Sequence, residues 1–446
     1  MAETVPGVPT VRTKRPHSVF LHAMSLNPAR IAGISVLLAS LLAASALLLP
    51  SSGVAAPATN DDGFDLATSS ALRVDADPAE QLPKPVRQPS SPYKRPGMWI
   101  WYVDASHGGN LKRIIKRAKK SNIGTLYIKS GDGTNVWSQF TSSMVDRFQR
   151  AGLKVCGWQY VYGSNPVGEA KVSAVAKRRG ADCFVIDAET EYEGNYSGAD
   201  RYIRKLRKLV GPKFRLSLST FPYAHFHPGF PYSVFLGPGA ATINLPQVYW
   251  KTIGDSVKES VGITWTYNRM YKRGIYPVGQ TYLGPPLKDL TRFQRFTASY
   301  GSVPSWWSWQ ETSSSEWSTL GRPLAGPYPR YRPVRTHPTT ERGARGDHVV
   351  WLQQHLVGAG FEVPITGIFG RQTRRAVRQF QKSVGLNVDG QVGNRTWNRL
   401  LRVQPVRVRW SGTRSRGSGA GISSSTRAPL SAGIPPKRNE LAGARR

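Results

Sequence analysis

The sequence predicts an α/β protein built around a (β/α)₈ TIM-like barrel, followed by a small three-helix module, with disordered linkers and a disordered tail. Strand-like and helix-like segments alternate eight times over 97–312, the number and size typical of such a barrel. Beyond it, 339–402 is a compact segment with a repeated turn motif. The runner-up is a doubly wound open sheet. It is disfavoured because no glycine-rich phosphate turn follows the first predicted strand.

The predicted strands are short runs of aliphatic, β-branched and aromatic residues. They occupy 97–104, 125–130, 154–163, 183–190, 214–221, 242–250, 276–282 and 303–312. Helices or loops are predicted between them. In the first helix, at 110–122, an apolar stripe formed by Leu111, Ile114, Ile115 and Ala118 is expected to face the strands.

The flanking segments predict export and a modular chain. Residues 31–49 carry no charge and follow a basic stretch, which fits either a signal peptide cleaved after Ala56 or an uncleaved signal anchor. The predicted divisions are an N-terminal export region (1–56), a disordered linker (57–96), the barrel (97–321), a proline-rich linker (322–338), the helical module (339–402) and a basic disordered tail (403–446).

The charge balance predicts anionic surroundings. The 446 residues include 61 Lys and Arg but only 27 Asp and Glu, a formal charge of +34, which suits nucleic acid, acidic lipid or an anionic wall polymer. The export segment argues against nucleic acid. We therefore expect a location in the cell envelope, with membrane attachment only if the apolar segment is retained.

Carboxylates at the predicted strand ends mark a candidate catalytic site. The fourth strand ends in VIDAETEY, and side-chain alternation places Asp187 and Glu189 on one face, with Glu191 following them. Asp104 ends the first strand in the same way. Acids crowded into a barrel mouth cannot all ionise freely, so one pKa should rise as a general acid requires. Such a set among aromatic residues suggests glycosidic bond cleavage.

These motifs carry a family resemblance. The DASH stretch at 104–107 and the D-x-E at 187–189 resemble the (β/α)-barrel muramidases of glycoside hydrolase family 25. The D-x-E is also similar to chitinase-type barrels that use substrate assistance. The resemblance implies that Glu189 is the general acid, that Asp187 orients the N-acetyl group or stabilises the cation, and that Asp104 is a supporting carboxylate. The third strand departs from the muramidase pattern, with Tyr160 and Tyr162 where Tyr-His is often found.

Other polar and aromatic residues near strand ends are candidate sugar contacts. Beside the catalytic candidates, the predicted substrate-binding set is Glu191, Tyr160, Tyr162, Gln247, Tyr249, Gln280, Tyr282, Trp307 and Trp309. Lys129 also ends a strand and is a further hydrogen-bond donor. Trp99 and Trp101 alternate opposite to Asp104, so we expect them to pack between barrel and helices.

Cysteine and histidine patterns predict no metal or cofactor. The eight histidines form no ligand constellation. Cys156 and Cys183 lie on adjacent predicted strands and on the same face. Buried thiols are the favoured interpretation, with a disulfide as the alternative in an oxidising compartment.

The C-terminal segment carries a repeated turn motif. The frame G-x-x-G-x-x-T occurs in 366–373 and again in 389–396, joined by LQ at 352–353 and AV-x-x-FQ at 376–381. With these motifs the segment resembles the peptidoglycan-binding domain 1 family. Thr366 stands where the family usually has Asp. The resemblance implies peptidoglycan as partner. Two functions remain open: a wall-targeted glycosidase, or a non-catalytic anchoring protein whose barrel only binds sugar or is inactive.

Overall fold

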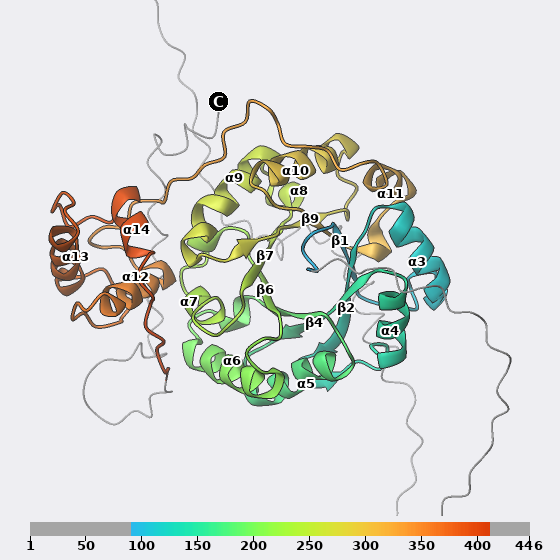
Figure 1. Ribbon diagram of the computed structural model, residues 1–446, viewed down its shortest axis with the longest axis horizontal. Coiled ribbons are helices and arrows are strands. Elements are labelled where there is room, and N and C mark those ends of the chain that lie inside the picture. Colours follow the sequence, from blue (N-terminus) through green and yellow to red (C-terminus); the bar gives the residue numbers. More distant parts are fainter. Residues whose placement is uncertain (1–90, 411–446) are drawn as a thin grey trace, which may run out of the picture. The chain divides into compact units, whose positions relative to one another are not determined.

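Parallel strands close into a barrel in the computed structural model, which describes residues 91–410 (Figure 1). The ring consists of β1 (Gly97–Ile100), β2 (Thr125–Asp132), β4 (Lys154–Val161), β5 (Cys183–Ala188), β6 (Leu216–Thr220), β7 (Ile243–Val248), β9 (Val278–Gln280) and β10 (Ser305–Trp307). Strand β1 pairs with both β2 and β10, so the ring has no open edge. Two short strands lie beside it, β3 (Asn135–Val136) on β2 and β8 (Gly274–Ile275) on β7. The predicted eight-stranded barrel is confirmed.

Helices surround the ring of strands (Figure 1). They are α3 (Leu111–Lys120), α4 (Ser142–Arg150), α5 (Pro166–Arg178), α6 (Tyr196–Val210), α7 (Tyr232–Phe235), α8 (Trp250–Ile253), α9 (Val257–Asn268), α10 (Leu287–Ser299) and α11 (Ser314–Leu320). Several begin at a short polar residue whose side chain accepts a backbone N–H of the first turn, as Asn110 does for α3 and Asn165 for α5. These caps fix where each strand-to-helix loop ends at the mouth of the barrel.

Side-chain alternation separates two cores. On β5, Phe184 and Ile186 pack outward among the helices, whereas Val185 packs inside the ring. The prediction for Trp99 and Trp101 is wrong. Met98 and Ile100 face the helices, Trp99 lies in the inner core, and Trp101 lines a cavity. The strand ends at Ile100, so its side-chain alternation does not extend to Asp104. The position of Asp104 therefore could not indicate which faces Trp99 and Trp101 occupy.

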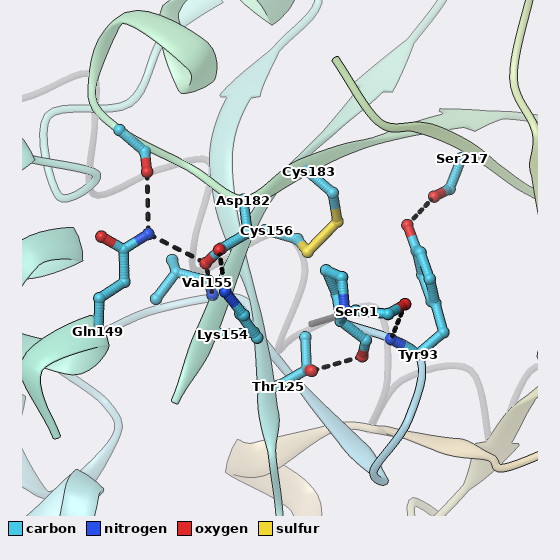
Figure 2. Close-up of a disulfide and its surroundings, with 12 residues drawn as sticks. Ser91, Tyr93, Thr125, Gln149, Lys154, Val155, Cys156, Asp182, Cys183 and Ser217 are labelled. Carbon is cyan, nitrogen blue, oxygen red and sulfur yellow. Dashed lines mark hydrogen bonds and ion pairs between the residues drawn. A yellow bond between two sulfur atoms is a disulfide. The ribbon is translucent and has the colours of Figure 1, made fainter. Parts of the chain in front are cut away.

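A disulfide joins two neighbouring strands inside the barrel (Figure 2). Cys156 on β4 and Cys183 on β5 are register partners with Cα atoms 4.6 Å apart, and both are fully buried. The favoured interpretation of buried thiols is therefore wrong. Around it, the Tyr93 hydroxyl lies 2.5 Å from Ser217 Oγ, and Asp182 accepts a bond from Lys154 Nζ (Figure 2). Cys156, Cys183 and Ser217 lie near the starts of their strands and are buried.

Three helices form the C-terminal module: α12 (Asp347–Gly358), α13 (Arg371–Ser383) and α14 (Asn394–Leu400). Its two turns are held alike. Gln353 Oε1 accepts the Gly367 amide and its Nε2 donates to Thr373 Oγ1, while Gln381 makes the same bonds with Gly390 and Thr396.

Thr366 performs the role that Asp389 has in the second turn. The Thr366 hydroxyl accepts the Ile368 amide at 3.2 Å, and the Asp389 carboxylate accepts the Gln391 amide at 2.8 Å. The Asp-to-Thr departure from the family pattern therefore leaves the turn intact.

Within residues 91–410, the module and the preceding linker contact the barrel. The fully buried Asp347 carboxylate accepts bonds from Ser233 and from the Tyr271 hydroxyl. In place of the expected disorder in 322–338, Tyr328 packs on Phe296 with ring centroids 4.6 Å apart. The apolar segment 31–49 and most of the first linker and the tail lie outside the described residues. Within 91–410, no helix combines the length and apolarity needed to cross a membrane.

Candidate active site

A cavity of about 430 Å³ opens at the carboxyl ends of the barrel strands, the end at which such barrels carry chemistry. Acidic and aromatic side chains together make up most of its lining. The lining side chains are Asp132, Asp187, Glu189 and Glu191, with Lys129, Ser219 and Gln247 as the other polar groups, and Trp99, Trp101, Trp158, Trp307, Tyr160, Tyr162 and Tyr249 as the aromatic ones. The cavity thus combines proton donors and acceptors with flat rings, as sugar binding requires.

Gln247 on β7 bridges the two central carboxylates. Its Nε2 donates to Asp187 Oδ1 at 3.0 Å and to Glu189 Oε1 at 2.9 Å. Because both oxygens bond to one nitrogen, they lie at most about 6 Å apart. Asp187 is buried inside the ring, whereas Glu189 follows the end of β5 and is half-buried. The amide therefore holds two acids side by side at the cavity floor.

Burial raises the pKa of both acids. For Asp187, the neighbouring Glu189 adds to that rise, and the positive charge of Lys129 and hydrogen bonds from Ser219 and Gln247 oppose it. For Glu189, the hydrogen bond from Gln247 opposes the rise in pKa and the Glu191 charge adds to it. The pair therefore retains a proton at a pH where ordinary carboxyls are ionised. A stored proton beside a carboxylate is what general acid catalysis needs.

Two tyrosines on β4 and the loop after it hold further acids at the rim. The Tyr160 hydroxyl donates to Glu191 Oε2 at 2.8 Å, and the Tyr162 hydroxyl donates to Asp132 Oδ1 at 2.8 Å. Burial, with Asp132 as the next cause, raises the pKa of Tyr162 to about 12. Both hydroxyls thus remain donors, and the tyrosines that replace the expected Tyr-His orient carboxylates.

Lys129 is a buried ammonium at the edge of the cavity. Its Nζ lies 2.5 Å from Asp132 Oδ2 and 4.6–4.9 Å from the ring centroids of Trp101, Trp137 and Trp158. The side chain is 4% exposed. Ring faces and a carboxylate together offset the cost of burying this charge.

Four tryptophans form a cluster in the lining of the cavity. Trp307 lies at the centre of the cluster, with its ring 5.4 Å from Trp158, 5.7 Å from Trp101 and 5.9 Å from Trp99. Trp101 remains 39% exposed. An exposed indole beside buried ones offers a flat, partly solvated platform for a ring-shaped ligand.

Of the predicted site residues, eight line this cavity: Asp187, Glu189, Glu191, Tyr160, Tyr162, Gln247, Tyr249 and Trp307. Four do not. Asp104 is exposed and its carboxylate accepts the amide of Ala105. Gln280 accepts the amides of Lys251 and Thr252, Tyr282 bonds to Thr252, and Trp309 packs on Trp317.

The sequence prediction missed part of the lining. Trp158 shares the alternation of Cys156 and Tyr160, and this signal could have identified it. Asp132 was missed because β2 continues two residues past the predicted strand. Trp99 and Trp101 were assigned to the wrong face. Within 91–410, no three His, Cys, Asp or Glu side chains are grouped as a metal site would need.

Comparisons with known proteins identify the module. Residues 345–400 match the model of the peptidoglycan binding domain family. The spore cortex-lytic enzyme of Bacillus cereus is 41% identical over 63 residues, and the zinc D-Ala-D-Ala carboxypeptidase of Streptomyces albus G is 36% identical over 69. These matches cover 14% and 15% of this chain. The chain spans only 24% and 27% of the length of those relatives.

Solved structures resemble the two regions separately. A peptidoglycan-binding protein from Clostridioides difficile is 39% identical over 14% of this chain and 40% of its own, with a TM-score of 0.14. The spore cortex-lytic enzyme SleL of Bacillus cereus is 9% identical over 50% of this chain and 72% of its own, with a TM-score of 0.37. A chitinase from Ipomoea carnea is 13% identical over 51% of this chain and 98% of its own, with a TM-score of 0.38.

Proposed function

We propose that the protein is an exported enzyme that hydrolyses the glycan of the cell wall, to which its peptidoglycan-binding module attaches it. The observation that carries the proposal is the pair of acids with raised pKa values, bridged by Gln247 in a cavity that tryptophans also line. Glu189 protonates the leaving glycosidic oxygen. Asp187 orients the N-acetyl group or stabilises the developing cation.

The neighbours of the pair support this division of roles. Lys129 favours the charged form of Asp187, whereas Glu191 disfavours charge on Glu189. Glu189 lies two residues after Asp187, just past the end of β5, and the two acids share one amide, so they lie on one side of a bound sugar. This arrangement favours substrate assistance over a nucleophile and an acid that flank the scissile bond.

The test is digestion of purified peptidoglycan sacculi by the full chain, with analysis of the released sugar ends. We expect new reducing ends, and their identity assigns the bond that is cut. Sacculi that bind the protein but release no fragment would favour the alternative, a peptidoglycan-anchoring protein with a sugar-binding or inactive barrel.

Replacing Lys129 with methionine should move the acidic limb of the pH profile of kcat/KM to higher pH. Methionine fits among the indole rings but removes the positive charge that lowers the pKa of Asp187. Asp187 then loses its proton only at higher pH, so the ionised form needed for catalysis appears later. A shift of about one pH unit is expected.

The pH profile separates this effect from loss of structure. A purely structural role for Lys129 would lower the rate at every pH and leave the limb in place. Lys116→Met, which removes an exposed charge from α3, is the control and should leave the profile unchanged.

A further inference from the structure

Helix α13 presents a stripe of positive charge on its outer side. Its exposed members are Arg371, Arg374, Arg375, Arg378 and Lys382. Their spacing places all five on one side of the helix over about 16 Å. The opposite side, which includes Ala376, Val377 and Phe380, is buried in the module. We call these five residues the α13 stripe.

No acid within the described residues neutralises the stripe. Helix α13 contains no Asp or Glu, and none of its five basic side chains takes part in an ion pair within 91–410. Asp389, beside the second turn, instead accepts a bond from Gln381 Nε2 at 2.8 Å. Like charges four residues apart repel one another on a helix. The positive charges of the stripe therefore do not stabilise the helix.

The second turn of the module supports two of the arginines. A Cβ atom at Gly390 would lie 2.9 Å from Arg374 Cγ and 3.1 Å from Arg378 Cγ, so the aliphatic stems of both arginines lie against this turn. Packed stems lose less freedom when the guanidinium binds a ligand. Four of the five residues are arginines, whose planar groups bind phosphate oxygens in pairs.

We propose that the α13 stripe binds a linear phosphodiester polymer of the cell wall. Its charge complements a polyanion rather than a neutral sugar, and its length follows a chain rather than a single anion. A lipid surface fits less well, because interfacial helices insert an apolar face and the apolar face of α13 is buried. The module would then hold two wall components, peptidoglycan and the anionic polymer.

The test measures binding of the full chain to sacculi before and after hydrofluoric acid removes phosphodiester-linked polymers. The stripe variant carries Arg371→Gln, Arg374→Gln and Arg378→Gln. The matched control removes three exposed charges from α3 by Lys112→Gln, Lys116→Gln and Lys119→Gln. Glutamine keeps both helices favourable.

We expect the wild type to bind untreated sacculi more tightly than extracted ones, and the stripe variant to bind both equally. Three lost phosphate contacts should make the slope of log affinity against log salt shallower by about two. The α3 control should keep most of the preference. Purified poly(glycerol phosphate) should displace the wild type from untreated sacculi.

Three results would overturn the proposal. The stripe variant could retain the preference for untreated sacculi. The α3 control could lose as much of this preference as the stripe variant does, which would show that binding depends on net charge in general. Duplex DNA could also displace the wild type more effectively than poly(glycerol phosphate) at equal phosphate concentration, which would assign the stripe to nucleic acid.

Discussion

Replacing Glu189 with glutamine should lower kcat on wall glycan by about 10²- to 10⁴-fold, the contribution expected of a general acid. The substitution removes only the transferable proton. Gln247 Nε2 donates to Glu189 Oε1 at 2.9 Å, and the glutamine amide oxygen can accept the same bond. Folding and glycan affinity should therefore stay close to those of the wild type. Initial rates of reducing-end release, with denaturation curves and sugar binding on the same preparations, check this.

Glu191→Gln is the matched control for that experiment. Glu191 lies at the exposed rim, and the Tyr160 hydroxyl that donates to it at 2.8 Å can donate to an amide oxygen instead. Its rate should fall by less than about tenfold, because no proton is transferred from it.

The control also carries its own pH signature. Glu191 helps to raise the pKa of Glu189, so its removal lowers that pKa. The protonated form of Glu189 is then lost at lower pH, and the basic limb of the rate profile should shift to lower pH.

Unchanged hydrolysis by Glu189→Gln would contradict the assignment of Glu189 as the general acid.

Asp187 could be predicted because its position depends on one strand alone. Alternation along VIDAET places Asp187 inside the ring regardless of the other strands, and the neighbours Val185 and Ile186 confirm the phase. Gln247 was predicted as a sugar contact at a strand end, but not as the partner that joins the acids. It comes from another strand, β7, and the folded barrel brings its amide within 3.0 Å of both carboxylates.

Asp104 and Trp309 lie beyond a strand end and were placed wrongly, because alternation stops where the strand stops. Asp104 lies four residues after β1 ends, in a turn where its own carboxylate accepts the next amide. Trp309 begins a short 3-10 helix after β10 and is buried against Trp317. Loop geometry depends on local hydrogen bonds that no hydrophobic period encodes.

Lys129 illustrates a further limit of sequence reasoning. A lysine at a strand end ordinarily extends into solvent. Here three indole rings from different segments and Asp132 enclose its ammonium. Such a cage depends on where three distant parts of the chain meet, and only Asp132 is close to Lys129 in sequence.

Removing the disulfide by Cys156→Ala with Cys183→Ala should lower the free energy of unfolding by about 3.5 kcal/mol at 25 °C. The bond closes a loop with a sequence separation of 27, and a loop of that length restricts the unfolded chain by about this amount. Chemical denaturation of both proteins under oxidising conditions measures the difference. With wild-type protein unfolded in a strong thiol reductant, the two denaturation curves should move close together.

The same variant should retain its activity at a temperature where both proteins are folded. Cys156 and Cys183 lie four residues before Tyr160 and Asp187 on their strands, a separation of about 13 Å along the strand. The register between β4 and β5 is also held by their own backbone hydrogen bonds and by packing of Val185 and Trp158. A loss of kcat as large as that of Glu189→Gln would show that the disulfide positions the acids. A fall in unfolding free energy below about 1 kcal/mol would show that the bond contributes little beyond the core that surrounds it.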